Sequence, residues 1–225
     1  MVKTKKRPVS VSAVAVDIVI FSMRDSELNV LLLQSRKGPF AGKWVLPGGL
    51  VTPEETLEES AERHMFAKAG LKNVYFEQLY TFGTVNRDPR NRVVSVAYIV
   101  LVPEEFFNPK TNELYGSVEW RAVSDLPKLG YDHNEIVSAA VDRLRSKLTY
   151  TNIVYGLLPE KFTLGELQKT YEVILRRKLD KRNFRKKILQ TKLLKKSSKK
   201  LVGQAYRPAE LYSFAKRTPQ FAEVV

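Results

Sequence analysis

Residues 44–71 read WVLPGGLVTPEETLEESAERHMFAKAGL, and this stretch decides the fold of the first half of the chain. A loop-rich segment runs from Gly38 to Gly49, and a run with helical character then extends from Pro53 to Ala69. Proline is favoured in the first turn of a helix, and glycine is favoured just past its end, where Gly70 stands. The pattern therefore predicts one clearly delimited helix over residues 53–69.

The segments around this helix have the patterns of strands. The first two predicted strands form a hairpin around the polar turn 23–27, and the charged loop 86–92 separates the third from the fourth. After Asp132, apolar residues recur at helical spacing as far as Leu148 and predict a closing helix. The strands are predicted, in chain order, at residues 11–21, 28–34, 74–82, 93–102 and 118–123.

The net charge of +14 is concentrated in the last third of the chain. Residues 1–150 hold 20 Lys and Arg against 18 Asp and Glu, whereas residues 151–225 hold 18 against 6. Such a basic segment attracts phosphate backbones through counterion release, so nucleic acid is the leading partner; the alternative is a solubilising basic tail. No apolar run reaches the about 20 residues of a membrane helix. The absence of cysteine favours a reducing, cytoplasmic location.

The pattern changes after Leu148 to short helices with a basic surface. Thr163 and Glu166 form a capping-box motif before one amphipathic helix, and a second helix is predicted from Asp180. Residues 193–201 and 211–214 then read as the two strands of a basic hairpin. Helix, turn, helix and hairpin are the parts of a winged helix. We therefore expect two domains, at residues 1–150 and 151–225.

The stretch at 44–71 resembles the Nudix signature G-x5-E-x7-R-E-U-x-E-E-x-G-U, in which U is an apolar residue. The spacing fits without a gap, but the three later glutamates of the signature fall on His64, Ala67 and Lys68. In Nudix enzymes those glutamates hold divalent cations, which need hard oxygen ligands. The resemblance implies an α+β fold, an α-β-α Nudix sandwich, that lacks the usual metal site; we expect no catalytic residue, no metal and no cofactor. The signature positions that match are Gly49, Glu55, Arg63, Met65, Gly70 and Leu71.

Two other interpretations of the altered signature stay open. Four other glutamates lie nearby, at positions 54, 58, 59 and 62. They form either an alternative metal site or a solvated acidic face early in the helix. Lys68 can replace the missing cation electrostatically and contact a phosphate, or the domain is retained only for folding or dimerisation.

The chain also resembles, from about Val11 to Phe214, the Nudix-related transcriptional regulators called NrtR. The resemblance rests on residues 82–83 and 87–95, and above all on residues 157–185, which end in Asp180-Lys-Arg-Asn-Phe-Arg185, and on residues 207–214. It implies a homodimer that binds a palindromic operator in double-stranded DNA through a C-terminal winged helix-turn-helix domain. It also implies an effector such as ADP-ribose or a related nucleotide or sugar phosphate. A pentose or pentose phosphate stays open as the effector. It also stays open whether the effector weakens or strengthens DNA binding.

The resemblance supplies the candidate site residues. Guanidinium groups bind diphosphates in a bidentate manner, and an aromatic ring stacks on a base or ribose. The ligand candidates are Arg36, Glu55, Arg63, Lys68, Phe82, Arg87, Asp88 and Arg92. Arg63 could instead form a structural ion pair with Glu55. Arg90 and Arg92 could instead be ordinary cations of an exposed loop.

For DNA, arginine reads guanine and asparagine reads adenine, so Arg182, Asn183 and Lys186 are the candidates for the major groove. Phosphate contacts are expected from Lys181, Arg185, Lys199, Lys200 and Arg207.

Three functions compete at this point. They are a ligand-sensing DNA-binding repressor, a Nudix hydrolase of ADP-ribose-like diphosphates with a rewired metal site and a nucleic-acid module, and an RNA-binding or protein-interaction adaptor. The missing carboxylates disfavour the hydrolase, and a wing without an aromatic stacking sheet disfavours single-stranded RNA. His64 and His133 have no partner spacing typical of a zinc site, so neither is assigned a role.

Overall fold

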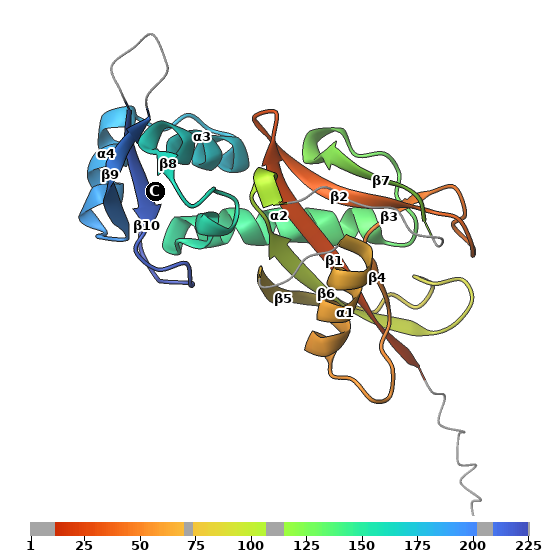
Figure 1. The fold of residues 1–225 in the computed structure, drawn as a ribbon. Helices are drawn as coiled ribbons and strands as arrows, with labels where there is room; N and C mark the ends of the chain where they lie inside the picture. Colours follow the sequence, from red (N-terminus) through yellow and green to blue (C-terminus); the bar gives the residue numbers. More distant parts are fainter. Residues whose placement is uncertain (1–11, 70–73, 107–114, 202–208, 225) are drawn as a thin grey trace, which may run out of the picture.

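The computed structural model describes residues 12–69, 74–106, 115–201 and 209–224, which form two domains (Figure 1). In the first domain, the described residues form a mixed seven-stranded sheet with the order β3-β2-β1-β6-β5, in which β4 also pairs with β1 and β7 with β2. The strands are β1 (Ala13–Arg24), β2 (Glu27–Ser35), β3 (Trp44–Val45), β4 (Gly48–Leu50), β5 (Tyr75–Phe82), β6 (Val93–Leu101) and β7 (Tyr115–Ala122). The helices are α1 (Leu57–Ala69) and α2 (His133–Tyr150), with short 3-10 turns η1 (Glu104–Phe106) and η2 (Val123–Asp125).

The predicted hairpin is confirmed, with a turn of only two residues. Asp25 and Ser26 both have positive φ, at 48° and 65°. This is the backbone that a tight type I′ turn needs, because its twist matches that of the flanking strands. The turn therefore fixes the register, in which Arg24 pairs with Glu27 and Phe21 with Val30.

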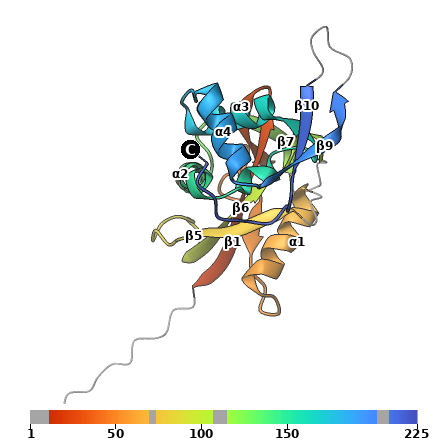
Figure 2. The same ribbon diagram turned by 90° about the vertical axis from the view of Figure 1, so that its left-hand side faces the viewer.

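Helices α1 and α2 cover opposite faces of the sheet, as the two views in Figures 1 and 2 show. Successive residues of a strand point to opposite faces. Val16 packs with Ala61 of α1, whereas Val19 packs with Ile136 of α2. Asp17 lies on the α2 face, next to the point where α2 begins. The expected α-β-α sandwich is confirmed.

Helix α1 begins at Leu57, so the predicted start at Pro53 was wrong. The Thr56 hydroxyl accepts a hydrogen bond from the backbone N–H of Glu59 at 3.2 Å, and the Glu59 carboxylate accepts one from the N–H of Thr56 at 2.8 Å. This reciprocal capping box satisfies two donors at the helix start. Pro53 lies instead in the preceding turn. The two hydrogen bonds of the capping box stabilise a helix start at Thr56 more than the preference of proline for a first turn stabilises a start at Pro53.

The second domain has the predicted winged-helix parts. It contains η3 (Ile153–Gly156), β8 (Phe162–Thr163), α3 (Leu164–Leu175), α4 (Lys181–Gln190), β9 (Leu194–Leu201) and β10 (Ala209–Phe214), with the strands in the order β8-β10-β9. The capping box of Thr163 and Glu166 is present at the start of α3. Tyr171 of α3 packs against Phe184 of α4, with ring centroids 5.3 Å apart. The two helices therefore share one apolar core.

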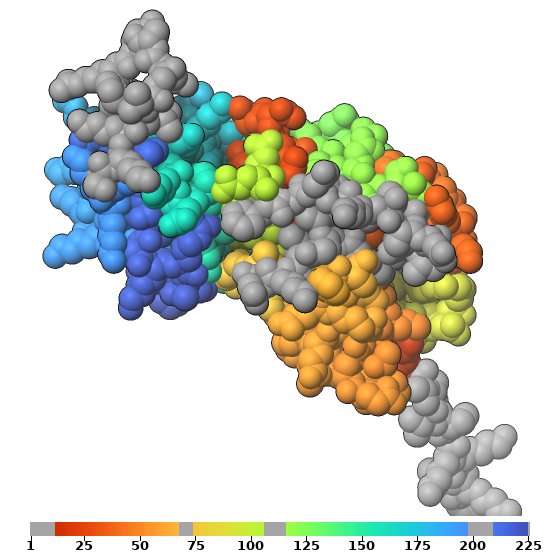
Figure 3. Space-filling model, viewed as in Figure 1, coloured from red at the N-terminus to blue at the C-terminus, as the bar shows by residue number. Residues whose placement is uncertain are grey.

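After β10, residues 215–224 return to the end of α2; we call them the C-terminal strap. Asn152 donates to the carbonyl of Thr218 at 3.1 Å and accepts from the N–H of Gln220 at 2.7 Å. The strap ends at Val224, which has no exposed surface. In the space-filling view, the two domains pack against each other without a break (Figure 3). None of the helices in the described part of the chain is long and apolar enough to span a membrane.

Candidate functional site

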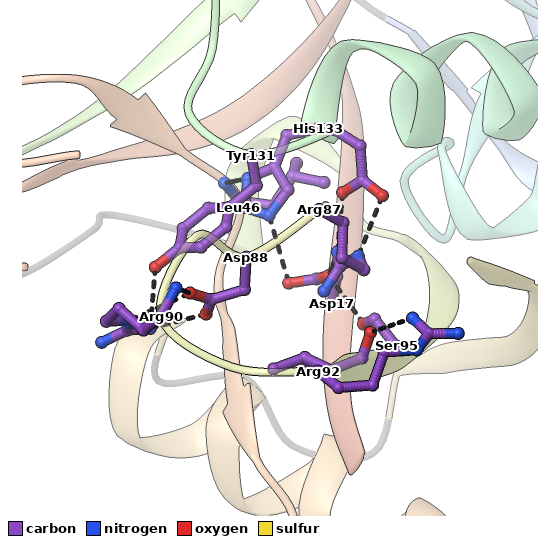
Figure 4. A network of polar contacts seen from close by, with 11 residues as sticks. Asp17, Leu46, Arg87, Asp88, Arg90, Arg92, Ser95, Tyr131 and His133 are labelled. Atoms are coloured by element: carbon purple, nitrogen blue, oxygen red, sulfur yellow. Dashed lines mark hydrogen bonds and ion pairs between the residues drawn. The ribbon is translucent and has the colours of Figure 1, made fainter. Parts of the chain in front are cut away.

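Asp17 is the centre of a buried polar network in the first domain (Figure 4). Its side chain is 9% exposed. It accepts hydrogen bonds from the Ser95 hydroxyl at 2.7 Å and from Nη2 of Arg87 at 2.8 Å, and Nε2 of His133 lies 3.3 Å from its second oxygen. Three elements that are distant in sequence therefore meet at one carboxylate.

His133 is held in one orientation by the backbone. Its Nδ1 accepts the N–H of Leu46 at 2.8 Å, so the ring carries its proton on Nε2 and donates it to Asp17. Burial alone would raise the pKa of Asp17, but the contacts with His133, Arg87 and Ser95 hold it well below its usual range. Asp17 is therefore a carboxylate at neutral pH.

Arg87 connects this carboxylate to a second one. Its Nε and Nη2 donate to the two oxygens of Asp132 at 2.9 and 2.7 Å, and its side chain is 3% exposed. Oxygens of Asp17 and Asp132 and a nitrogen of His133 lie within 4.8 Å of one another, which is a spacing suited to a metal ion. Here the Arg87 guanidinium already binds both carboxylates and supplies the positive charge between them.

Nudix enzymes hold divalent cations at the later glutamates of the signature, but the residues at those positions in this chain do not fit a cation. The signature positions carry His64, Ala67 and Lys68, which offer no carboxylate oxygen. Among the described residues, the Asp17 cluster is the one group of three converging ligands, and it binds Arg87. No catalytic step through a metal follows from this arrangement.

A cavity of about 270 Å³ opens beside the network. Cations stand at its edge: Lys37 is exposed, and the Arg90 side chain is 56% exposed. Arg90 forms a two-point ion pair with Asp88, at 2.7 and 3.0 Å, and donates to the Tyr131 hydroxyl at 3.3 Å. This pair keeps the pKa of Asp88 below its usual value. We call this cavity the Asp17 pocket; it is lined by Ala15, Asp17, Ser35, Lys37, Val45, Leu46, residues 48–50, Arg87, Asp88, Arg90, Val93, Tyr131 and His133.

Two glycines let the backbone approach closely at the wall of this pocket. A Cβ on Gly48 would lie 2.3 Å from the carbonyl oxygen of Val16, so only glycine fits there. A Cβ on Gly49 would lie 2.6 Å from Cε1 of His64. His64, which replaces the first of the three missing glutamates, is thus buried against the glycine that opens the signature.

The predicted ligand residues are only partly brought together. Arg87 and Asp88 line the Asp17 pocket, but both already have ion-pair partners. Glu55 and Arg63 form a salt bridge at 2.5 Å, and Arg63 also donates to the carbonyl of Leu50, a residue of the pocket wall, at 3.2 Å. The Arg63 hydrogen bond, followed by that from the Thr52 N–H, lowers the pKa of Glu55 to about 2.

Of the other ligand candidates, Arg36, Phe82 and Arg92 are not among the residues that line the pocket. Arg92 donates to the carbonyls of Thr84 and Val93, both at 3.3 Å, and Phe82 packs half-buried against the main core. Arg36 is exposed. The side chain of Lys68 lies outside the described residues.

Sequence reasoning missed Lys37, Tyr131 and His133 as pocket residues. One signal was present, because Asp17 is a charged residue inside an otherwise apolar strand. A buried carboxylate needs donors, and the adjacent pair Asp132-His133 at a helix start was a candidate source. Nothing in the sequence links the two, since they are separated by more than a hundred residues.

Helix α4 offers a second candidate site. Phe184 and Ile188 are buried in the domain core, and the Asp180 side chain caps the helix by accepting from the N–H of Asn183 at 2.8 Å. The predicted DNA contacts on this helix are all exposed, namely Lys181, Arg182, Asn183, Arg185 and Lys186. The side chains of Lys199 and Lys200 and the whole of Arg207 lie outside the described residues.

Known proteins share both halves of this architecture. The NUDIX domain model matches residues 11–140, and the model of the NrtR DNA-binding winged helix domain matches residues 154–214. An ADPR-responsive transcriptional repressor of Acinetobacter baylyi is 35% identical over 205 residues, covering 89% of this chain and 81% of the relative. An ADP-ribose pyrophosphatase of Methanocaldococcus jannaschii is 32% identical over 126 residues, covering 56% of this chain and 70% of the relative.

A solved structure supports the same assignment. The crystal structure of Shewanella oneidensis NrtR complexed with a 27mer DNA matches with a TM-score of 0.80 and 33% identity, covering 89% of this chain and 93% of that one. This match runs across both domains, as does the match to the A. baylyi repressor. The chain therefore belongs to the NrtR family of transcriptional regulators, in which a Nudix domain precedes a DNA-binding winged helix.

Proposed function

We propose that this protein is a repressor that binds double-stranded DNA through α4 and responds to ADP-ribose, or to a related nucleotide or sugar phosphate, bound in the Nudix domain. The observation that carries the proposal is the combination of an exposed basic helix on a winged helix with a Nudix pocket whose carboxylates bind arginine. The names of the A. baylyi repressor and the M. jannaschii pyrophosphatase both point to ADP-ribose.

The DNA-binding part of the proposal rests on the two faces of α4. Its buried face fixes the helix to the core, and its exposed face presents Arg182, Asn183 and Lys186. A helix of this kind inserts into the major groove, where arginine and asparagine distinguish bases. Lys181 and Arg185 flank this face and are proposed to contact phosphates.

We further propose a homodimer on a palindromic operator. One α4 contacts only a few base pairs, so two copies are needed for a long specific site. Half-sites on one face of B-DNA then lie about 34–36 Å apart, or at a multiple of that distance.

The Asp17 pocket is the proposed effector site. Lys37 and Arg90 stand at its edge, where a diphosphate can bind, and the ring of Tyr131 lines it, 4.4 Å from the Phe40 ring and 5.1 Å from the His133 ring between centroids. A diphosphate competes with Asp88 for Arg90. Binding of the effector therefore reorganises the loop that carries Arg87, Asp88 and Arg90.

Hydrolysis of the effector is not part of the proposal. The positions that would hold the cations carry an imidazole, a methyl group and an ammonium. The rival function is a hydrolase with a rewired metal site, and the likeness to a pyrophosphatase keeps it as the second candidate to be tested.

One titration distinguishes the two functions. The protein is titrated into labelled duplex from its own upstream region at fixed salt, with and without ADP-ribose, and AMP is measured in the same tubes with added Mg²⁺. Sequence-specific binding that ADP-ribose changes, without AMP, supports the repressor. AMP release that a chelator abolishes, without a specific complex, overturns it.

Matched variants test the role of α4. Arg182→Ala should weaken operator binding by about 1–3 kcal/mol and relax the base preference at one position. Lys181→Ala should weaken all sequences equally and reduce the salt slope by about 1. Lys128→Ala removes one exposed charge from the first domain and serves as the control; equal losses in all three variants would contradict recognition by α4.

A further inference from the structure

A second cavity system lies where the two domains meet. Two adjoining cavities of about 270 and 420 Å³ share Ser26, Val173 and Arg176 in their linings. Ser26 belongs to the tip of the β1–β2 hairpin, which lies beside α3 in Figure 1. We call the combined space the junction groove; it is lined by residues 26–28, 123, 124, 141 and 145 of the first domain and residues 169, 172–174 and 176–178 of the second.

The floor of the junction groove is apolar and rigid. Leu28 and Val141 of the Nudix domain are 8% and 5% exposed, and Ile174 of α3 is 1% exposed. All three belong to the main hydrophobic core. The floor is therefore part of the packed core rather than a flexible loop, and only the small exposed parts of these side chains face the groove.

The groove carries more cations than carboxylates: Lys169, Arg176, Arg177 and Lys178 stand against Glu27 and Glu172. Among the described residues, Lys169, Arg176 and Arg177 form no ion pair with a carboxylate; Lys169 donates instead to the Ser26 hydroxyl at 2.5 Å. The nearby carboxylate of Glu172 is occupied by the Leu179 N–H, Gln168 and Lys178. Three like charges around one cavity repel each other, and an anion relieves that repulsion.

Two contacts between the domains hold the groove open in this shape. Nε of Arg145, on α2, donates to the carbonyl of Ile174 at 2.9 Å, which binds the end of α3 to the first domain. The Lys169–Ser26 hydrogen bond ties the middle of α3 to the hairpin tip. The two walls of the groove are thus supplied by different domains and kept at a fixed separation.

We propose that the junction groove binds a small organic phosphate, with its apolar body on Leu28, Val141 and Ile174 and its phosphate between Lys169, Arg176 and Arg177. No lining residue is shared with the Asp17 pocket, so this is a separate ligand site. An occupant contacts both domains and stabilises their docked arrangement. The site does not depend on which effector the Nudix domain binds.

The experiment uses the absence of cysteine from the chain. Ser124→Cys places one thiol on the groove, and a trifluoromethyl label on it reports occupancy by ¹⁹F NMR of the full-length protein. Phenyl phosphate is the probe, because it joins an apolar ring to a dianion. The same label on Ser138→Cys, an exposed position of α2 that lines neither cavity, is the control.

The proposal expects a saturable shift at position 124 with none at position 138, and weaker binding of inorganic phosphate, which lacks the ring. Lys169→Gln with Arg177→Gln should weaken phenyl phosphate about tenfold or more, since charge-assisted hydrogen bonds to phosphate are lost. Lys181→Gln with Arg182→Gln removes one lysine and one arginine from the same domain, outside the groove, and should change the affinity less than about twofold.

Melting curves establish that both double variants are folded. The absence of a saturable shift at position 124, or an equal loss of affinity in the two double variants, would overturn the proposal. The first result means that the groove is empty, and the second means that the net charge of the domain, rather than the groove, attracts the probe.

Discussion

Asp17 stands in a strand whose neighbours are buried and apolar, and it is tolerated because every partner it needs is supplied by another element. Arg87 bonds Asp17 and Asp132 together, and His133 and Ser95 donate to the remaining lone pairs. A buried charge costs several kcal/mol unless it is paired and hydrogen-bonded. The network is therefore expected to be more important for folding than the exposed ion pairs around it.

The first prediction concerns Arg87. Arg87→Ala leaves two buried carboxylates without their common partner and should lower the free energy of unfolding by about 3–5 kcal/mol. Arg90→Ala breaks an ion pair whose arginine is 56% exposed and should cost less than about 1 kcal/mol. Urea unfolding measures both. Equal losses in the two variants would show that the buried network contributes no more to the free energy of unfolding than an exposed ion pair.

The second prediction concerns pH and Asp17. Its pKa is lower in the folded protein than in the unfolded chain, so its contribution to stability is present above the unfolded value of about 3.9 and is lost as the pH falls toward the folded value. Wild-type protein should therefore lose stability steeply below about pH 4, and Asp17→Asn should start less stable but show a shallower loss. Urea midpoints from pH 7 to pH 3 test this; parallel curves would exclude Asp17 as the source.

Among the elements, α1 and α3 begin in the same way, with a threonine and a glutamate three residues later that cap each other. The box at Thr163 was predicted because no competing signal stands beside it. The box at Thr56 was missed because Pro53 gives a strong start signal three residues earlier. Local patterns thus predicted that both helices exist. The exact start of α1 depended on whether the proline or the capping box determines it, and the capping box forms more hydrogen bonds.

The third prediction follows for α3. Thr163→Ala removes the hydroxyl that accepts from the Glu166 N–H and should destabilise the winged helix by about 1 kcal/mol. Thr163→Ser keeps the acceptor and should cost far less. The readout is the melting temperature together with operator affinity, which should fall with the loss of folded domain. A serine variant as unstable as the alanine variant would point to packing of the threonine methyl group instead.

At the scale of the whole molecule, sequence patterns predicted a Nudix-like domain followed by a winged helix, the first hairpin and the polar face of α4, because these depend on patterns within one element or between adjacent ones. The Asp17 pocket was only half predicted. Arg87 and Asp88 came from a family motif, whereas His133 and Tyr131 reach the pocket only because α2 begins above β1. Contacts of that kind depend on how elements pack, and no local pattern encodes them.

The C-terminal strap is the extreme case, because it has little apolar periodicity and is held by polar contacts together with one buried apolar residue, Val224. Arg217 donates to the carbonyl of Tyr155 at 2.5 Å, of Leu158 at 2.9 Å and of Pro159 at 3.2 Å. These carbonyls lie in residues 151–161, the first segment of the second domain, which connects α2 to β8. Three backbone acceptors of this connection therefore share one guanidinium, which ties the start of the second domain to the strap.

The last prediction tests this dependence. Both Lys216 and Arg217 are exposed, but only Arg217 binds the three carbonyls, so Arg217→Ala should cost about 1 kcal/mol while Lys216→Ala should be close to neutral. Limited proteolysis of Arg217→Ala should cut first between residues 150 and 163, because the connection opens before either domain unfolds. Unchanged proteolysis with lowered stability would mean that Arg217 stabilises one domain only. Cleavage confined to residues 150–163 would show that the strap holds the segment through which α2 leads into the winged helix.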